Sequence, residues 1–335
     1  MASTQTIADL DERALIARIH ARVPHTHPDL IAGIGDDAAI IRPARNRAEV
    51  ITTDALVEDI HFRRAWSSPR DIGAKAMAVN LSDLGAMGAE ARFATISLAL
   101  PAGLLLDDFD ELIEGIAGAA RASDVVIAGG NLTRSPGPLV IDITAMGAVH
   151  ARKALRRAAA RVNDEVYVTG TIGAGAAGLA WLERHGVPEE HHAAWPAVRR
   201  ACRPSPPLRA GLALSRSRAS RAAIDLSDGL SDGLLRLSEA SECAIAVDAA
   251  ALPVDPSARA IAAELGLDPM RLAIDGGDDY ELLFTVSPRH RGRLRGVAAL
   301  LRAPITRIGV VRSGAGVSID GSGPPGTGFD HFRRA

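Results

Sequence analysis

Acidic residues stand beside glycine or hydroxyl residues at five separate points of the chain. These clusters are Gly35-Asp36-Asp37, Thr52-Thr53-Asp54, Asn80-Leu81-Ser82-Asp83, Asp225-Leu226-Ser227-Asp228-Gly229 and Gly276-Gly277-Asp278-Asp279-Tyr280-Glu281. Mg²⁺ prefers hard oxygen ligands, and proteins usually hold it with a few carboxylates together with substrate phosphates. Five clusters of this kind, drawn from distant parts of the chain, predict a site that binds several metal ions and phosphate groups.

Each cluster taken alone has a simpler interpretation, because Asp and Gly are ordinary turn formers and helix caps. Asp228 stands where it can cap the helix that is expected after it. His61, seven residues after Asp54, can be an ordinary structural histidine. The number of clusters, and the repeated pairing of Asp with Ser or Thr, favours a metal site over five unrelated turns.

A glycine run in the second half offers a competing function. The segment Gly173-Ala174-Gly175-Ala176-Ala177-Gly178 matches the G-x-G-x-x-G pattern between a predicted strand and a predicted helix, as in dinucleotide-binding folds. The acid expected roughly 20 residues further on is missing, because Ala197-Val198-Arg199 stands there. The run therefore favours a tight strand–helix turn that can touch a phosphate, with a dinucleotide-dependent oxidoreductase as the alternative.

Alternating strands and helices are expected to position these clusters. In the first half, strands are predicted at residues 38–42, 50–53, 92–100, 124–128 and 139–149, and helices at 69–88 and 107–121, after an amphipathic helix that begins near Thr6. In the second half, strands are predicted at 165–169 and 222–225. The pattern is typical of an α/β (α+β) fold, with an N-terminal mixed sheet covered by helices and a C-terminal α/β domain.

Length and composition limit the alternatives. The 335 residues suit two domains, expected at 1–150 and 151–335, and the net charge of −2 with 3% aromatic residues argues against a nucleic-acid partner. The chain has no apolar run of about 18 residues, so no membrane association is expected and the cytoplasm is the expected location. Cys202 and Cys243 are far apart and form no CxxC, which argues against a zinc site or a disulfide framework. The P-loop and protein-kinase motifs are absent, which excludes those kinase classes.

In their order and approximate spacing, the clusters resemble the thiamine-monophosphate kinase family. The resemblance covers nearly the whole chain and rests on these segments: Gly33-Ile34-Gly35-Asp36-Asp37, Thr53-Asp54, His61-Phe62, Ala78-Val79-Asn80-Leu81-Ser82-Asp83-Leu84 with Met87-Gly88, Gly129-Gly130, Tyr167-Val168-Thr169-Gly170, Asp225-Leu226-Ser227-Asp228-Gly229-Leu230, Gly276-Gly277-Asp278-Asp279-Tyr280-Glu281-Leu282 and Asp330-His331-Phe332. Aminoimidazole ribonucleotide synthetase and selenophosphate synthetase belong to the same wider group.

The resemblance implies a specific reaction and assembly. The protein would use ATP to phosphorylate thiamine monophosphate to thiamine diphosphate, with several Mg²⁺ ions. The N-terminal domain would bind ATP and metal and would pair its sheet with that of a second copy in a homodimer. The C-terminal domain would complete the active-site cleft between the domains.

The resemblance also implies three groups of site residues, carried over position by position. The metal ligands, direct or through water, are Asp37, Thr52, Thr53, Asp54, Asp83, Asn131, Asp225 and Asp228. The ATP contacts are Gly130, Asn131, Arg157 and Ser227, and the contacts to the thiamine end are His61, Asp278 and Phe329.

Three of these positions depart from the family pattern. Asn131 stands where Asp is usual, Asp278 where Glu is common, and Phe329 where the aromatic residue is often Tyr. The first departure predicts a weakened metal site. The alternative is that Asn131 only shapes a turn after Gly129-Gly130, since Asn tolerates left-handed backbone angles.

The implied reaction needs no catalytic base, because a phosphate monoester with a second pKa of about 6 is already mostly a dianion near pH 7. Two unit charges about 4 Å apart repel by about 4 kcal/mol at an effective dielectric of 20. Metal ions held by carboxylates would offset this repulsion and align the groups for in-line transfer. Two further alternatives are a relative that acts on another substrate, such as selenophosphate synthetase, and a non-catalytic Ca²⁺- or nucleotide-binding module. This chain lacks the reactive Cys that selenophosphate synthetase usually carries near its N-terminus, and it lacks the EF-hand pattern expected of a Ca²⁺-binding module.

Overall fold

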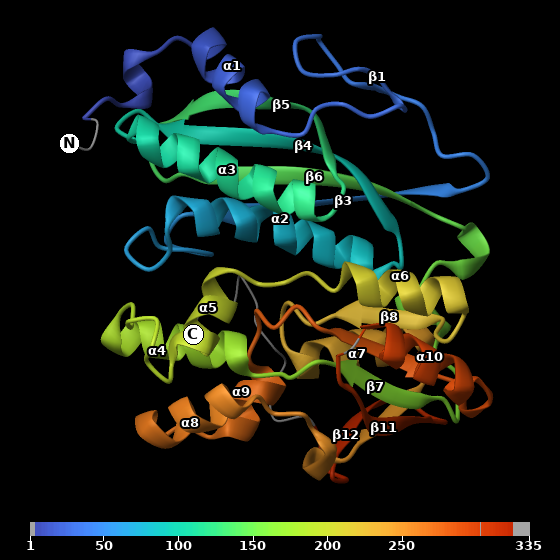
Figure 1. The fold of residues 1–335 in the computed structure, drawn as a ribbon. Helices are drawn as coiled ribbons and strands as arrows, with labels where there is room; N and C mark the ends of the chain where they lie inside the picture. The colour runs from blue at the N-terminus through green and yellow to red at the C-terminus, as the bar shows by residue number, and fades with distance from the viewer. Residues whose placement is uncertain (1–3, 302, 324–335) are drawn as a thin grey trace. The chain divides into compact units, whose positions relative to one another are not determined.

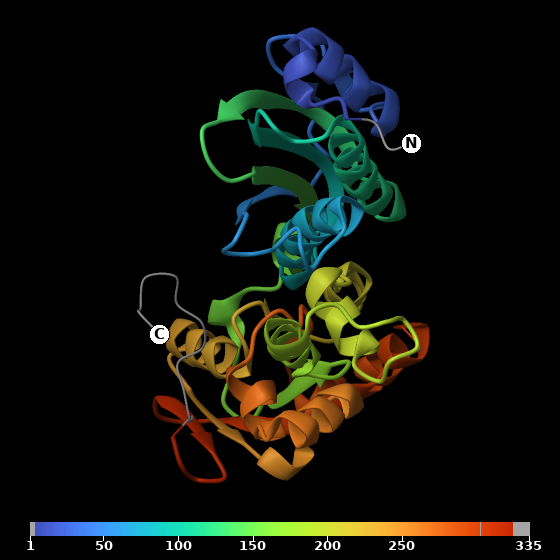
Figure 2. The ribbon, with the colours of Figure 1, turned by 90° about the vertical axis from the view of Figure 1, so that its left-hand side faces the viewer.

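The chain forms two compact units, each with its own sheet and helices (Figures 1 and 2). The structure, a computed structural model, describes residues 4–301 and 303–323. Unit 1 takes the chain as far as Leu84 together with Glu90–His150, and unit 2 takes Gly85–Ala89 and the chain from Ala151 onward. The predicted α/β fold, with a mixed sheet in the first half, is therefore confirmed.

Unit 1 is built on a mixed sheet whose order over the described residues is β3-β6-β4-β5. Its strands are β3 (Ala48–Val57), β4 (Glu90–Pro101), β5 (Val126–Ser135) and β6 (Val140–Val149). Neighbouring strands are antiparallel except for the parallel pair β4 and β5. Helices α2 (Pro69–Ala86) and α3 (Leu106–Ala122) lie on one face of this sheet (Figures 1 and 2). The shorter elements of unit 1 are the 3₁₀ helix η1 (Ile7–Asp9), α1 (Glu12–Arg22), β1 (Leu30–Ala32) and β2 (Ile40–Ile41).

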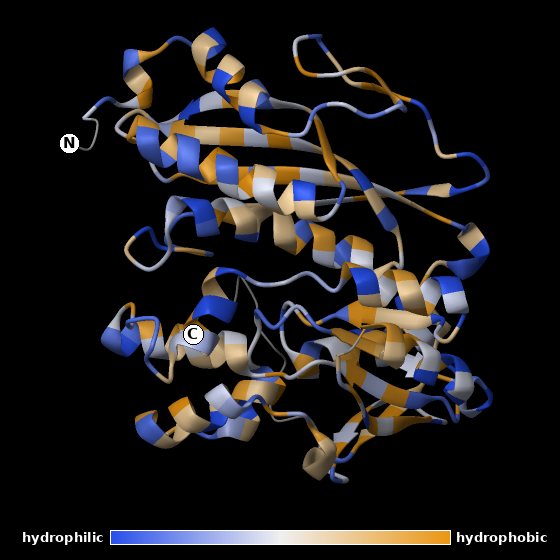
Figure 3. Cartoon of the chain, in the orientation of Figure 1, coloured by the Kyte–Doolittle hydropathy of each residue, from blue (hydrophilic) through white to orange (hydrophobic). Residues whose placement is uncertain are grey.

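Alternation along the strands separates the two faces of this sheet. On β6, Ile141, Ile143 and Ala145 are buried, whereas Asp142 and Thr144 between them are only half-buried. Successive side chains of a strand point to opposite faces, so the apolar set faces the helices and the polar set faces away from them. The strands accordingly carry hydrophobic and polar bands in alternation (Figure 3). We call the face opposite α2 and α3 the outer face.

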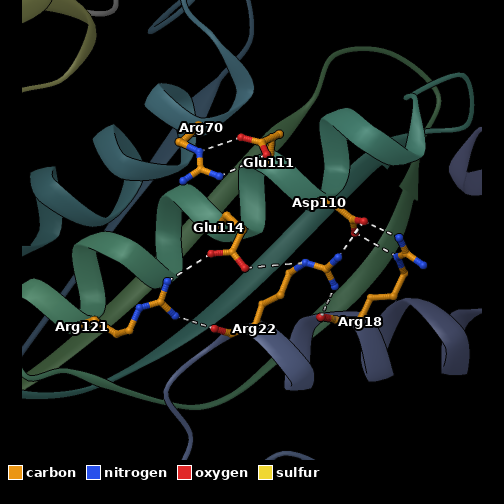
Figure 4. Close-up of polar contacts among 7 residues, drawn as sticks. All are labelled: Arg18, Arg22, Arg70, Asp110, Glu111, Glu114 and Arg121. Atoms are coloured by element: carbon orange, nitrogen blue, oxygen red, sulfur yellow. Dashed lines mark hydrogen bonds and ion pairs between the residues drawn. The ribbon is translucent and has the colours of Figure 1, made fainter. Parts of the chain in front are cut away.

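Helix α3 is held by an apolar stripe and by ion pairs on its sides. Its Phe109 and Ile113 are fully buried. Asp110 accepts hydrogen bonds from two arginines of α1, and Arg70 of α2 donates two hydrogen bonds to Glu111, at 2.7 and 3.1 Å (Figure 4). Because Arg70 and Glu111 are about half exposed, this pair stabilises the packing by only about 0–1 kcal/mol. The buried stripe therefore contributes most of the stability of α3.

Unit 2 contains a larger sheet, with the order β12-β9-β11-β7-β10-β8 over the described residues. Only the pair β12 and β9 is parallel within that sheet as described. Its strands are β7 (Glu165–Thr169), β8 (Ala222–Asp225), β9 (Ala244–Val247), β10 (Leu282–Val286), β11 (Ile305–Arg312) and β12 (Gly316–Ile319). Its helices are η2 (Ala151–Lys153), η3 (Arg157–Ala159), α4 (Ala174–His185), α5 (Trp195–Cys202), α6 (Leu208–Ser217), α7 (Leu230–Ser241), η4 (Ala249–Ala251), α8 (Pro256–Leu265), α9 (Pro269–Asp275), η5 (Pro288–His290) and α10 (Arg291–Leu301).

The helix expected from Thr6 onward is divided in two. A 3₁₀ turn, Ile7–Asp9, comes first, and α1 begins only at Glu12, because Asp11 caps it by accepting a hydrogen bond from the Ala14 amide at 2.8 Å. None of the helices in the described ranges is long and apolar enough to cross a membrane.

Candidate active site

A cavity of about 300 Å³ lies on the outer face of the unit 1 sheet. Asp36 and Asp37 line it from the loop before β2, Gly130 and Asn131 from β5, and Asp142 from β6. Its lining is rich in carboxylate and amide oxygens, which suits a hydrated cation with its phosphate partner better than an apolar ligand. Within the described part of the chain, no group of three or more His, Cys, Asp or Glu residues is placed so that it could hold a metal ion.

The register of the strands brings these residues together. Ser97 of β4 pairs with both Asn131 and Asp142, so the three residues form one row across β5, β4 and β6. In the next row, Thr53 of β3 pairs with Thr144 of β6. The two rows lie two residues apart along each strand and therefore share the outer face.

Asp142 is a site residue that the sequence analysis missed. Thr53 Oγ1 donates a hydrogen bond to Asp142 Oδ1 at 2.8 Å, and Thr144 Oγ1 donates to Thr53 Oγ1 at 3.1 Å. In this arrangement the Thr53 hydroxyl has its proton and one lone pair engaged, and one lone pair remains for a ligand. The available signal was a lone acid inside the alternating apolar segment 139–149, out of phase with the buried residues.

Thr52 and Thr53 point to opposite faces of β3. The Thr52 hydroxyl donates to the Asp83 carboxylate of α2, and the Asp54 amide donates to Asn80 Oδ1 at 3.0 Å. The ligands predicted in unit 1 therefore form two groups, with Asp37, Thr53 and Asn131 on the outer face and Thr52, Asp54 and Asp83 on the side of α2.

Asn131 lies inside β5, where it pairs with Ser97, and its backbone is not left-handed. The alternative that Asn131 only shapes a turn is therefore wrong. At Gly130, a Cβ would stand 2.0 Å from the Ile96 carbonyl oxygen of β4, so only glycine allows this close approach. The glycine is thus required for the strand pairing, whatever else its backbone contacts.

His61 anchors the turn that follows β3. Its Nδ1 accepts a hydrogen bond from the Val57 amide at 3.0 Å, and its own amide donates to the Val57 carbonyl at 2.9 Å. These bonds give His61 a structural role, as the simpler interpretation held. Its contact with the thiamine end stays a prediction.

Two loops of unit 2 carry predicted site residues and lie side by side. The first, residues 225–229, leads from β8 into α7, and the second, residues 276–281, leads from α9 into β10. The Asp278 amide donates to the Ser227 carbonyl at 2.7 Å, which joins the predicted substrate contact to the predicted ATP contact. Asp225, at the end of β8, is buried.

The remaining predicted residues of unit 2 are placed as follows. Asp228 does not cap α7, because Gly229 is its N-cap and no side chain bonds there; instead the Asp228 carboxylate lies 3.9 Å from the Arg236 guanidinium. Arg157 is exposed in η3, and its carbonyl accepts a hydrogen bond from Ser241 Oγ at 2.6 Å. Phe329 lies outside the described residues.

The glycine run of residues 173–178 is the predicted strand–helix turn, and two of its amides are already engaged by a side chain. Gly173 and Gly175 donate to the Asp279 carboxylate at 2.6 and 3.1 Å. A carboxylate of the chain itself thus occupies the position that a phosphate takes at a dinucleotide site. The dinucleotide interpretation is therefore wrong, and the contact of this turn with a phosphate stays a prediction.

Both halves of the chain match the domains of one known group of proteins. Residues 35–149 match the AIR synthase related protein, N-terminal domain, and residues 161–321 match the AIR synthase related protein, C-terminal domain. The thiamine-monophosphate kinase of Escherichia coli (strain K12) is 39% identical, covering 96% of this chain and 98% of the relative. That of Bacillus subtilis (strain 168) is 36% identical, covering 90% and 92%.

Solved structures agree with these relatives. Thiamine-monophosphate kinase from Stenotrophomonas maltophilia K279a is 38% identical with a TM-score of 0.84, covering 93% of this chain and 98% of that one. AaThiL complexed with AMPPCP and TMP is 30% identical with a TM-score of 0.78, covering 89% and 92%. The chain therefore belongs to the thiamine-monophosphate kinase family of the AIR synthase related proteins.

Proposed function

We propose that this chain phosphorylates thiamine monophosphate with ATP, giving thiamine diphosphate and ADP. The observation that carries the proposal is the match over both units to thiamine-monophosphate kinases, which include AaThiL complexed with AMPPCP and TMP. The site chemistry is consistent with it, since the outer-face cavity offers carboxylate and amide oxygens beside a glycine pair.

We infer that the metal is Mg²⁺, and that several ions bind. The oxygen donors around the cavity fit Mg²⁺, which keeps several waters and binds through a few carboxylates plus substrate phosphates. When bound, the ions would neutralise the phosphate charges and so lower the electrostatic cost of bringing acceptor and donor together.

The residues of unit 1 would divide the metal ligands between two places. Asp37, Thr53 and Asn131 would bind metal on the outer face, where the hydrogen bond from Thr53 to Asp142 fixes the Thr53 hydroxyl. Thr52, Asp54 and Asp83 would bind metal on the side of α2. Gly130 and Asn131 would also contact ATP.

The residues of unit 2 would supply the remaining contacts. Asp225 and Asp228 would bind metal, Ser227 would contact ATP, and the Arg157 guanidinium would clamp nucleotide phosphates through paired N–H donors. Asp278, with His61 and Phe329, would contact the thiamine end. No side chain is needed to deprotonate the acceptor, because its phosphate is mostly a dianion near pH 7.

We further infer a homodimer that pairs the outer faces of two unit 1 sheets. The outer face is covered at one end by the segment of β1 and β2, whose Leu30 and Ile41 pack against the cluster of Phe93, Val126 and Ala128. Beyond it, Ile51 of β3 is 67% exposed, and a second copy paired with this face would remove its apolar side chain from water. As a user of ATP, the protein is expected in the cytoplasm.

Chromatography of a reaction containing the purified chain, ATP, Mg²⁺ and thiamine monophosphate tests the function. Thiamine diphosphate and ADP should accumulate together, and EDTA should stop both. Consumption of ATP with another acceptor, while thiamine monophosphate stays intact, would show that the substrate assignment is wrong.

A further inference from the structure

A buried group of charged residues lies directly behind the loop that carries Asp278. We call Asp279, Glu281 and Arg200 the buried clamp. The Asp279 side chain is almost completely inaccessible, at 1% exposure, and the side chains of Glu281 and Arg200 are 16% and 23% exposed. The proposed reaction assigns no role to these three residues. Their contacts with the 276–281 loop indicate what they do.

Asp279 fixes the loop to the start of α4. Its two carboxylate oxygens accept hydrogen bonds from different amides, Oδ2 from Gly173 at 2.6 Å and Oδ1 from Gly175 at 3.1 Å. Amides at a helix N-terminus carry partial positive charge, and both oxygens of this carboxyl group face such amides. An Asn side chain has only one acceptor oxygen and would leave one of the two amides without its partner.

Arg200 holds the same loop from α5. Its guanidinium donates to the Asp279 carbonyl oxygen at 2.9 Å and to Glu281 Oε1 at 2.5 Å. Glu281 also accepts a hydrogen bond from Thr169 Oγ1 at 2.5 Å. The loop is therefore held by α4, α5 and the end of β7 at once, and all of these contacts lie within unit 2.

The clamped loop has a conformation that side chains rarely adopt. Asp278 and Tyr280 both have left-handed backbone angles, with φ of 64° and 49°, on either side of Asp279. Such angles cost free energy for residues other than glycine and persist only where surrounding contacts impose them. The Tyr280 hydroxyl then donates to Asp278 Oδ1 at 3.0 Å, which sets the direction of that carboxylate.

The packing behind the loop leaves no room for adjustment. A Cβ on Gly175 would stand 2.6 Å from the Asp278 carbonyl oxygen, and a Cβ on Gly277 would stand 2.3 Å from the Ser227 carbonyl oxygen. The Asp278 and Tyr280 amides also donate to the neighbouring loop, to the carbonyls of Ser227 and Leu226 at 2.7 and 2.9 Å. The position of the Asp278 carboxylate therefore follows from the position of Asp279.

We propose that Asp279 is a positioning residue that orients Asp278 toward the thiamine end of the acceptor and so sets the affinity for that substrate. This inference rests on the proposed function. Asp279 touches neither substrate nor metal in this account, and acts only through the loop.

The test compares D279N with a matched control, D255N. Asp255 is also a helix-capping acid of unit 2, which accepts hydrogen bonds from Thr171 Oγ1 and from the Ser257 amide. Among the described residues, none of its hydrogen bonds reaches the 276–281 loop, while its charge acts on Arg200, so D255N also tests whether the loss of a charge near the buried clamp is enough to change the substrate affinity. Initial rates are measured with thiamine monophosphate and Mg·ATP varied separately, and binding of thiamine monophosphate is measured by calorimetry. Thermal melts report whether each variant is folded.

D279N should raise the KM and the Kd for thiamine monophosphate by about tenfold, the loss expected for one buried hydrogen bond, and should leave the KM for ATP within about threefold. D255N should leave all of these values near wild type. If folded D279N keeps the wild-type KM for thiamine monophosphate, or if D255N changes it as much, the inference is wrong.

A second variant covers the case in which D279N does not fold. Y280F removes only the hydroxyl that donates to Asp278, and should raise the KM for thiamine monophosphate severalfold with little change in kcat. An unchanged KM in Y280F, when D279N is unfolded, overturns the inference. A wild-type chain that does not turn over thiamine monophosphate contradicts the proposed function and this inference with it, whereas wild-type turnover with unaffected variants contradicts the inference alone.

Discussion

At the scale of single residues, Asn131 is the clearest difference between this sequence and the family pattern, which usually has Asp at this position. An Asn offers one neutral carbonyl oxygen where a carboxylate would bring a charge. The structure shows where the missing charge would matter. Asn131 and Asp142 lie in one row on either side of Ser97, and both line the same cavity. The row therefore holds one carboxylate instead of two.

Replacing Asn131 by Asp should lower the Mg²⁺ concentration needed for the half-maximal rate. One added unit charge near the cation is expected to contribute about 1 kcal/mol in this exposed cavity, or about fivefold in concentration. The measurement is a Mg²⁺ titration of the initial rate for wild type and N131D at saturating ATP. Superimposable curves would mean that residue 131 does not ligate metal.

Replacing Asp142 by Asn should act in the opposite direction. The Thr53 hydroxyl would lose its charged acceptor and the cavity would lose its nearest carboxylate on β6, so the half-saturating Mg²⁺ concentration should rise by about fivefold. Binding of Mn²⁺, followed by its electron paramagnetic resonance signal, gives the same comparison without turnover. D124N is the control, because Asp124 is an exposed acid of unit 1 whose left-handed backbone Asn tolerates. If D142N and D124N titrate alike, Asp142 has no part in the metal site.

At the scale of elements, the sequence predicted best those strands that are buried on both sides. The strands at 165–169 and 222–225 are confirmed residue for residue as β7 and β8, because short, mainly apolar runs bounded by turn residues have the length of a buried strand rather than of a helix. The strand predicted at 124–128 instead continues to Ser135 as β5. Its second half resembles a loop in sequence because Asn131, Thr133 and Arg134 are exposed on the open sheet.

Contacts between elements explain what the sequence could not predict about the candidate site. Thr52 and Thr53 are neighbours in the sequence, but strand geometry places them on opposite faces of β3. Asp142 becomes a site residue only when strand register sets it beside Thr53. Asp279 meets the Gly173 amide across 106 residues of sequence, and no local pattern predicts such a pairing.

The contact between Asp279 and α4 should also make unit 2 sensitive to pH. Burial raises the pKa of Asp279 to about 7 from an ordinary value of 3.8, against the opposing effect of the Gly173 and Gly175 amides. The folded state therefore holds this proton to higher pH than the unfolded state does. Its contribution to stability is full below about pH 4 and is lost as the pH rises from about 4 to about 7.

Calorimetric unfolding of wild type and D279N at several pH values between 5 and 8 measures this effect. The wild-type free energy of unfolding, taken relative to that of D279N, should fall by up to about 1.4 kcal/mol per pH unit and level off above about pH 7. At Asp255, the hydrogen bonds from Ser257 and Thr171 outweigh burial and the pKa is lowered. D255N keeps Asp279, so its free energy of unfolding should run parallel to that of wild type between pH 5 and 8. A wild-type curve parallel to that of D279N across this range would contradict the account.

At the scale of the whole molecule, the predicted site residues are shared between the two units. The metal ligands up to Asn131 lie in unit 1, and Asp225, Asp228 and Asp278 lie in unit 2. The match to thiamine-monophosphate kinases likewise covers 90% or more of the chain in the Bacillus subtilis and Escherichia coli relatives. The activity is therefore a property to be tested on the entire chain.

The most direct test compares two acceptors that differ by one phosphate. Initial rates are measured with ATP and Mg²⁺ and with either thiamine monophosphate or free thiamine, and the products are identified by mass. Because the attacking group in this account is a phosphate dianion, thiamine monophosphate should give thiamine diphosphate and ADP in equal amounts, and free thiamine should give no phosphorylated product. Phosphorylation of free thiamine at a comparable rate, or formation of ADP without thiamine diphosphate, would contradict the account.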